Sequence, residues 1–298
     1  MRRLVFGSLL AVVLALQPAA AQFGLPAVTT SFADADDTVP LPDDFEPGAL
    51  RPLTAQPTGP DGAYRLGPGA YGATVQSFCL HAGTYGPSKG GGYLYAPLKG
   101  ARADIIRTIL RGAPDHPDVE QSDVQRLLWA IEADMAVREL PRATRRAAEA
   151  LLSPQDIASL ATNDVRELVE RARALAPLPP AVGGWMDLHA RLRTLISDPN
   201  AGFAEIERLA VRSGVPPRGG PEIPRGRWSA HPSGAFVRYL PEGYSRTTIE
   251  VYVPPRPSGI TDAIEFDPRG DVAVPANTGS QRLGISGPVD QATAIARR

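Results

Sequence analysis

The sequence predicts an α+β protein with a central helical domain, a short β region around its single cysteine, and a small β-rich unit toward the C-terminus. Three observations carry this prediction. Apolar residues recur with helical spacing through the middle of the chain, and aromatic residues alternate with small ones before that stretch. β-Branched and aromatic residues flank a Pro-Glu-Gly turn after it, as in a hairpin.

The first residues predict export. The opening stretch, "MRRLVFGSLLAVVLALQPAAAQ", has an arginine pair, an apolar run and a small-residue cleavage site, so we expect residues 1–21 to be a signal peptide. No later stretch is apolar enough to predict a membrane span. We therefore expect the mature protein in the periplasm or outside the cell.

The next segments predict a loose start followed by a helical domain. Residues 22–62 are rich in Pro, Asp, Thr and Gly, which is typical of a disordered lead-in. Residues 63–215 are expected to form the mainly helical domain, opening with two short strands around a glycine loop. The helical patterns that follow cover 101–112, 122–140, 153–175, 185–197 and 200–214.

The last part of the chain predicts a separate small unit. Residues 216–298 begin with a proline- and glycine-rich stretch, which favours a linker. The sequence "GAFVRYLPEGYSRTTIEVYVP" then predicts a β-hairpin, and the tail behind it predicts one weak strand among loops. This pattern places a β-hairpin unit and an irregular tail after the helical domain.

Composition excludes several classes of partner and cofactor. The chain has 298 residues and a formal net charge of −1, which argues against nucleic acid as the main partner. Its four histidines and single cysteine show no spacing typical of a metal site, and no phosphate-loop motif is present. We therefore expect no metal and no cofactor.

Cys79 is the residue that points to chemistry. It lies in "SFCLHAGTYGPSKGGGY" and is the only cysteine, so no disulfide can form within the chain. Exported proteins usually pair their cysteines. An unpaired one is a buried apolar side chain, a link to another chain, or a reactive thiol. The sequence leaves these three alternatives open.

Two motifs give Cys79 a possible partner. Phe78-Cys79-Leu80 stands before a loop with proline and glycine, and "DVQRLLWAI" places Gln125 four residues before Trp129. Over residues of about 70–135 this arrangement resembles the thioester domains of bacterial surface adhesins, although Val124 and Leu127 stand where those domains have Thr and Ala.

The resemblance implies a covalent attachment module. The sulfur of Cys79 would attack the side-chain carboxamide of Gln125 and expel ammonia, leaving an internal thioester. That thioester would acylate an amine on a partner protein or surface ligand, once per molecule, so the protein would not be an enzyme in the usual sense. His81 is a candidate to activate the thiol. The aromatic residues expected to shield the acyl group from water are Phe78, Tyr93, Tyr95 and Trp129.

Other interpretations of the same residues remain. Ser122 and Gln125 fit a capping box, in which the glutamine side chain bonds back to the start of its own helix. With Cys79 simply buried, the protein would be a non-covalent structural or interaction protein of the cell envelope. A third possibility is a cysteine hydrolase, which requires a histidine imidazole beside Cys79.

Overall fold

The computed structural model of the protein describes residues 26–87, 91–161, 180–217, 219–255 and 263–289, including the side chains of all but 180–182. The predicted signal peptide and the later part of the helix predicted at 153–175 lie outside these residues.

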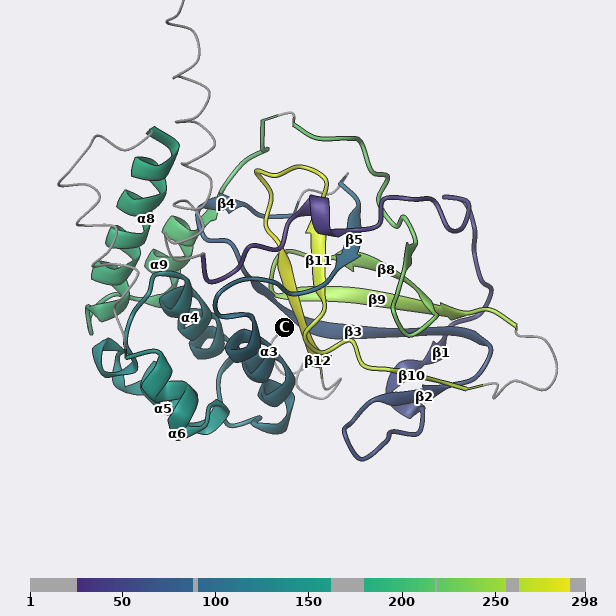
Figure 1. The fold of residues 1–298 in the computed structure, drawn as a ribbon, viewed down its shortest axis with the longest axis horizontal. Helices are drawn as coiled ribbons and strands as arrows, with labels where there is room; N and C mark the ends of the chain where they lie inside the picture. The colour runs from purple at the N-terminus through teal and green to yellow at the C-terminus, as the bar shows by residue number, and fades with distance from the viewer. Residues whose placement is uncertain (1–25, 88–90, 162–179, 218, 256–262, 290–298) are drawn as a thin grey trace, which may run out of the picture.

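The main element of the described chain is an eight-stranded sheet (Figure 1). Seven strands follow the order β5, β11, β12, β3, β9, β8, β7, each antiparallel to its neighbour, and β1 adds to β3 in parallel. The strands of this sheet are β1 (Arg51–Pro52), β3 (Gly69–Cys79), β5 (Tyr93–Ala96), β7 (Ser229–Ala230), β8 (Phe236–Pro241), β9 (Arg246–Val253), β11 (Val272–Pro275) and β12 (Leu283–Pro288). Two-stranded ribbons join β2 (Tyr64–Leu66) to β10 (Ile264–Phe266) and β4 (Thr84–Tyr85) to β6 (Val211–Arg212).

The expected arrangement of a central helical domain with separate β units is wrong. Strand β3, expected to be short, pairs with β9 of the C-terminal hairpin on one side and with β12 of the tail on the other. The β region around Cys79 and the C-terminal unit are therefore one sheet. The tail strands escaped prediction because β11 is buried at every position and β12 at all but its last. Such strands show no polar–apolar alternation.

The sheet curls until its two edges meet. The backbone N–H of Tyr95 in β5 donates to Ser229 Oγ in β7, at 3.1 Å. This contact brings the first and last strands of the order together in a near-barrel. The interior holds a continuous apolar core that includes Tyr71, Val75, Val237, Tyr239, Ile249, Val251, Phe266, Leu283 and Ile285.

The described helices gather at one end of the sheet (Figure 1). They are α3 (Ala103–Gly112), α4 (Gln121–Glu132), α5 (Arg142–Leu151), α6 (Pro154–Ser159), α8 (Pro180–Ser197) and α9 (Phe203–Ala210). Helix α3 packs on β12, and a Cβ at Gly284 would come within 2.9 Å of side-chain atoms of both Leu110 and Leu80. A glycine at this position allows the close packing of helix and strand. A second apolar core fills the space between helices and sheet, and Cys79 belongs to it.

The helix that carries Gln125 differs from its predicted bounds. Helix α4 ends at Glu132 rather than continuing to residue 140. Asp134 follows with φ of 55°, a left-handed conformation that ends a helix, and a 3₁₀ turn then covers Val137–Glu139. The break lets the chain turn away from the sheet toward α5.

Residues 26–62, predicted to be disordered, lie along the sheet. The ring of Phe45 packs edge-on against Trp228, with 6.3 Å between ring centroids. Asp43 forms an ion pair with Arg227, and Glu46 lies 2.8 Å from the guanidinium of Arg238. These contacts join positions more than 180 residues apart. Local composition carries no signal of such distant pairing.

The alternation along β9 gives a stability test. Ile249 is fully buried in the barrel core, whereas its neighbour Thr248 is only partly buried, beside Thr74. We expect Ile249→Ala to lower the free energy of unfolding by about 2–5 kcal/mol, because it leaves a cavity. The matched variant Thr248→Ala should change it by less than about 1 kcal/mol. Urea denaturation measures both, and equal effects would contradict the barrel core.

Candidate functional site

Cys79 is the last residue of β3 and is fully buried. On one side β3 continues to pair with β12: Cys79 stands opposite Leu283, and the Leu80 N–H donates to Arg282 O at 2.9 Å. On the other side the pairing with β9 runs only as far as Gln76 opposite Arg246. The main chain of Cys79 therefore faces a place where the neighbouring strand has already turned away.

The side chain of Gln125 fills that place. Its Oε1 accepts a hydrogen bond from the Cys79 N–H at 2.8 Å, and its Nε2 donates to the Cys79 carbonyl at 3.0 Å. Both bonds are buried, and Gln125 is 1% exposed. The carboxamide thus takes the place of a strand residue in the ladder. It lies directly against Cys79, the residue with which the sequence motifs pair it.

The capping interpretation of Gln125 is wrong. Helix α4 begins at Gln121 with Glu120 as its N-cap residue, and no side chain caps it. Gln121 makes a contact similar to that of Gln125 one turn earlier, because its Nε2 donates to Ser245 O at 2.7 Å. Two glutamines on one face of α4 thus bond the strand edge in succession.

Aromatic side chains enclose the pair. Trp129 is fully buried, and its ring stacks on Phe203 with 5.7 Å between centroids and 17° between planes. The ring of Tyr244, from the β8–β9 turn, lies 6.2 Å from Trp129. Phe78 and Tyr93 are also buried in the cores around Cys79. Three of the four predicted shielding residues are therefore near the pair or in the core beside it.

Tyr95, the fourth, lies elsewhere. Its ring packs edge-on against His231, with 4.8 Å between centroids, close to Asp271. Burial, followed by the charge of Asp271, raises the pKa of Tyr95 to about 12. Tyr95 therefore contributes to the closure of the barrel.

Burial dominates the electrostatics of Cys79. It raises the pKa of the thiol to about 12, and the carboxylate of Glu132 adds to the rise. The indole N–H of Trp129 and the backbone N–H of His81 act in the opposite direction. The thiol is therefore protonated at neutral pH and needs a base before it can attack.

Glu132 is a buried carboxyl whose charge acts on that thiol. Burial raises the pKa of its carboxyl to about 8, although its Oε2 accepts a hydrogen bond from the Ala82 N–H at 2.9 Å. A group with this pKa both takes up and releases a proton near neutral pH. Glu132 was not among the residues predicted from the sequence, yet it stands seven residues after Gln125 on the same helical face, which is a usable signal.

Arg282 adds a partly buried cation near Glu132 and Cys79. Burial lowers the pKa of its guanidinium, and the charges of Glu132, Cys79 and Asp34 act against that change. Nothing in the local sequence around Arg282 indicated this position. Buried polar atoms here that find no hydrogen-bond partner among the described residues include Tyr93 Oη, Glu132 Oε1, Gln281 Oε1 and Arg282 Nη1.

His81 reaches the sulfur through its backbone. Its N–H is one of the groups that favour the thiolate of Cys79, after the indole of Trp129. Burial lowers the pKa of its imidazole to about 3, with smaller contributions from Arg282 and His189, so the ring is neutral at neutral pH. Within the described part of the chain no hydrogen bond joins an imidazole to Cys79 Sγ. The predicted role of its side chain as thiol activator has no contact to support it.

A pocket of about 260 Å³ opens beside Gln125. It lies between the start of α4, the start of α9 and the β8–β9 turn. Its lining includes the side chains of Phe78, Gln121, Gln125, Phe203, Glu207 and Tyr244. Gln125, although buried, therefore contributes to the lining of this recess.

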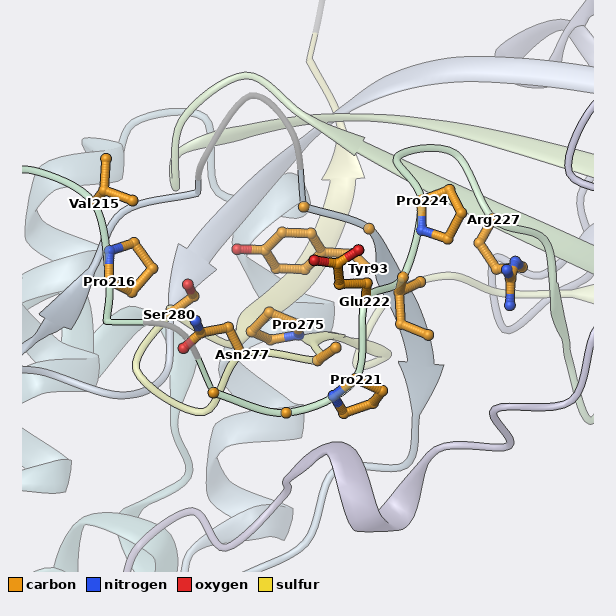
Figure 2. Close-up of a pocket in the computed structure, with 16 residues that line it drawn as sticks. Tyr93, Val215, Pro216, Pro221, Glu222, Pro224, Arg227, Pro275, Asn277 and Ser280 are labelled. Atoms are coloured by element: carbon orange, nitrogen blue, oxygen red, sulfur yellow. The ribbon is translucent and has the colours of Figure 1, made fainter.

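A larger pocket, of about 800 Å³, lies on another part of the molecule (Figure 2). Figure 2 shows the ring of Tyr93 in its lining, surrounded by the rings of Pro216, Pro221, Pro224 and Pro275. Glu222, Asn277 and Ser280 supply polar groups. Tyr93 is close enough to Cys79 for the charge of a thiolate to raise its pKa, in addition to the larger effect of burial.

Two classes of site are absent from the described residues. No group of three His, Cys, Asp or Glu side chains there is arranged to hold a metal ion. None of the helices in that part of the chain is long and apolar enough to span a bilayer. Comparison with protein-family models, curated proteins and solved structures finds no match to this chain.

The Gln125 contact predicts a difference between the two glutamines of α4. We expect Gln125→Ala to lower the free energy of unfolding by roughly 2–4 kcal/mol, because it leaves a buried N–H and a buried carbonyl unsatisfied. Gln121→Ala should cost less than about 1 kcal/mol, because it removes a more exposed bond. Urea denaturation of both variants checks this, and equal losses would be inconsistent with the buried ladder contact.

Glu132 predicts a pH dependence of stability. Its pKa is about 8 in the fold and 4.5 without it, so the folded protein holds a proton that the unfolded chain has released. The free energy of unfolding should therefore fall as pH rises through this range. Between about pH 6.5 and 8 we expect a loss of roughly 1–2 kcal/mol that Glu132→Gln removes.

The pH dependence of Glu132→Gln is best compared with that of the unmodified protein above pH 6.5. Below that pH the buried His81 and His189, with pKa lowered to about 3 and 4, give a dependence of the opposite sign. Glu149→Gln, an exposed change on α5, serves as the control and should follow the unmodified protein. An unchanged pH dependence in Glu132→Gln would show that Glu132 is ionised in the fold.

Proposed function

We propose that this protein is an exported covalent attachment module, in which Cys79 and Gln125 form an internal thioester that acylates an amine on a partner. The observation that carries the proposal is the pair of buried hydrogen bonds between the Gln125 carboxamide and the Cys79 main chain. Residues 46 positions apart, paired by resemblance alone, lie in direct contact.

The proposed thioester formation uses the groups that surround the pair. The proton of the Cys79 thiol passes to Glu132, and the sulfur attacks Cδ of Gln125. Negative charge then develops on Oε1, where the Cys79 N–H already donates at 2.8 Å and stabilises it. The Cδ–Nε2 bond breaks, the nitrogen takes the proton, and ammonia leaves. One thiol and one carboxamide thus give one thioester and one ammonia.

The surroundings suit a long-lived acyl group. The rings of Trp129, Phe203 and Tyr244 cover the pair. A thioester from which water is excluded survives until a nucleophile arrives. The pocket beside Gln125 gives an amine a route to the acyl carbon. When the amine attacks, the new amide forms on Gln125 and the thiol of Cys79 is released.

A second candidate is a non-covalent structural or interaction protein of the cell envelope. The two bonds from Gln125 satisfy the main chain of Cys79 completely, which is a sufficient structural reason for the contact. This alternative gives no role to the buried Glu132 and Arg282. A buried carboxyl and guanidinium are costly in a core that needs only a small apolar side chain.

The surroundings do not favour a cysteine hydrolase. That chemistry uses a thiolate paired with an imidazole. Here burial raises the pKa of Cys79 to about 12, and the side chain directed at the sulfur is the indole of Trp129.

The thioester has a direct test in the mass of the intact protein. Mature protein purified without added thiols or amines should be lighter than its sequence by one ammonia. Methylamine should then add to it in one equivalent. Cys79→Ala and Gln125→Glu should show the full sequence mass and no addition.

Gln125→Glu guards against a trivial loss of folding, since its oxygen still accepts the bond from the Cys79 N–H. Circular dichroism of that variant checks the fold. Full sequence mass in the unmodified protein, with no methylamine addition, would exclude the thioester and leave the structural alternative.

A further inference from the structure

The pocket beside Gln125 is lined by a carboxyl side chain that is hydrogen-bonded to a tyrosine. Glu207 lines the pocket from α9, and its Oε1 accepts a short hydrogen bond from the hydroxyl of Tyr244. The turn that carries Tyr244 is itself fixed, because the Tyr244 carbonyl accepts a bond from Ser77 Oγ at 2.9 Å. Glu207 and Tyr244 thus link α9 to the β8–β9 turn across the recess in front of Gln125.

Tyr244 connects this link to the reactive pair. Its ring lies 6.2 Å from Trp129, and a charge on Cys79 contributes to the rise of its pKa, after burial and Glu207. The phenol therefore remains protonated and donates to Glu207. This hydrogen bond therefore lies in the lining of the same pocket as Gln125.

The chemistry of an amine nucleophile requires a base at this position. A primary amine is an ammonium ion at neutral pH, and only its deprotonated form attacks a carbonyl. Apart from Glu207, the pocket is lined by aromatic rings, glutamines and hydroxyls, together with Glu120 at the start of α4. A carboxylate beside aromatic faces attracts an ammonium and can take its proton.

We propose that Glu207 is the catalytic base of the attachment reaction, which binds the incoming ammonium and removes its proton. The inference depends on the proposed thioester. The ammonium displaces the Tyr244 hydroxyl and gives one proton to Glu207. Its nitrogen lone pair attacks Cδ of Gln125, the Cδ–Sγ bond breaks, and a proton goes to the sulfur of Cys79. The products are an amide on Gln125 and a free thiol.

Glu207 acts among other charged and titratable groups. Tyr244 faces it from the β8–β9 turn, and Glu120 lines the same pocket from the start of α4. Arg126 of α4 lies over the ring of Phe203, with 5.9 Å from its guanidinium carbon to the ring centroid.

The test compares two nucleophiles on the full mature chain. Methylamine is an ammonium ion at pH 7 and needs a base, whereas hydroxylamine is uncharged at that pH and does not. Intact mass follows the rate at which each one consumes the thioester. We expect Glu207→Gln to slow methylamine addition by at least about 10-fold, and to leave the rate with hydroxylamine within about 2-fold.

The matched control is Glu205→Gln, which removes the same charge from an exposed position of the same helix. It should leave both rates unchanged. The hydroxylamine rate also reports folding, because a misfolded variant would lose its thioester. Glutamine keeps an oxygen that accepts the Tyr244 bond, so the link across the pocket is preserved.

Failure of this inference is separable from failure of the proposed function. A mature protein of full sequence mass would show that no thioester forms, and the proposed function would fail. A thioester in both proteins with equal methylamine rates shows that Glu207 is not the base. Loss of the thioester in Glu207→Gln alone would also overturn the inference, since Glu207 would then serve formation rather than attack.

Discussion

The arrangement of the site depends on how one strand ends. Strand β9 turns away after Arg246, while β3 continues to Cys79 with an N–H and a carbonyl that need partners. Gln125 supplies both, so the main chain is satisfied only when α4 lies against the sheet edge in one register. That register also fixes Trp129 and Glu132, which follow on the same face of α4. A backbone requirement thus positions the side chains that surround the thiol.

The sequence could predict the parts of this arrangement that rest on local pattern. The pairing of Cys79 with Gln125 and the cover by Trp129 came from the resemblance that two short motifs carry, and the β8–β9 hairpin from its turn and its β-branched residues. The sheet could not be predicted in the same way. Its order places the N-terminal strands β5 and β3 among strands from the C-terminal part of the chain. Strands β11 and β12 also lack the polar–apolar alternation that marks a half-buried strand. Glu207, a charged residue in an ordinary amphipathic helix, gains significance only from Tyr244, which lies 37 positions away.

The buried charges near Cys79 separate the two functional candidates on physical grounds. Gln125 by itself is explained by the ladder, and Cys79 by itself by the core. Neither the ladder nor the core explains Glu132 and Arg282. Each of these two side chains loses hydration, and each keeps an atom without a hydrogen-bond partner among the described residues. Groups left in this state cost free energy that hydrophobic residues of similar size would not. Their cost is understandable if they move protons for the neighbouring thiol.

In the proposed reaction, the same geometry would keep the fold intact. Thioester formation would remove Nε2, and with it the donor that the Cys79 carbonyl uses. Attack by a primary amine replaces that nitrogen with a secondary amide that still carries one N–H. The ladder contact can then form again with the partner attached. The acyl carbon belongs to Gln125, so the partner approaches through the recess beside α4 and α9, and the larger pocket around Tyr93 lies off this route. A covalent link made there ends in a hydrogen-bonding pattern close to the one from which it started, which favours a stable, single-use attachment.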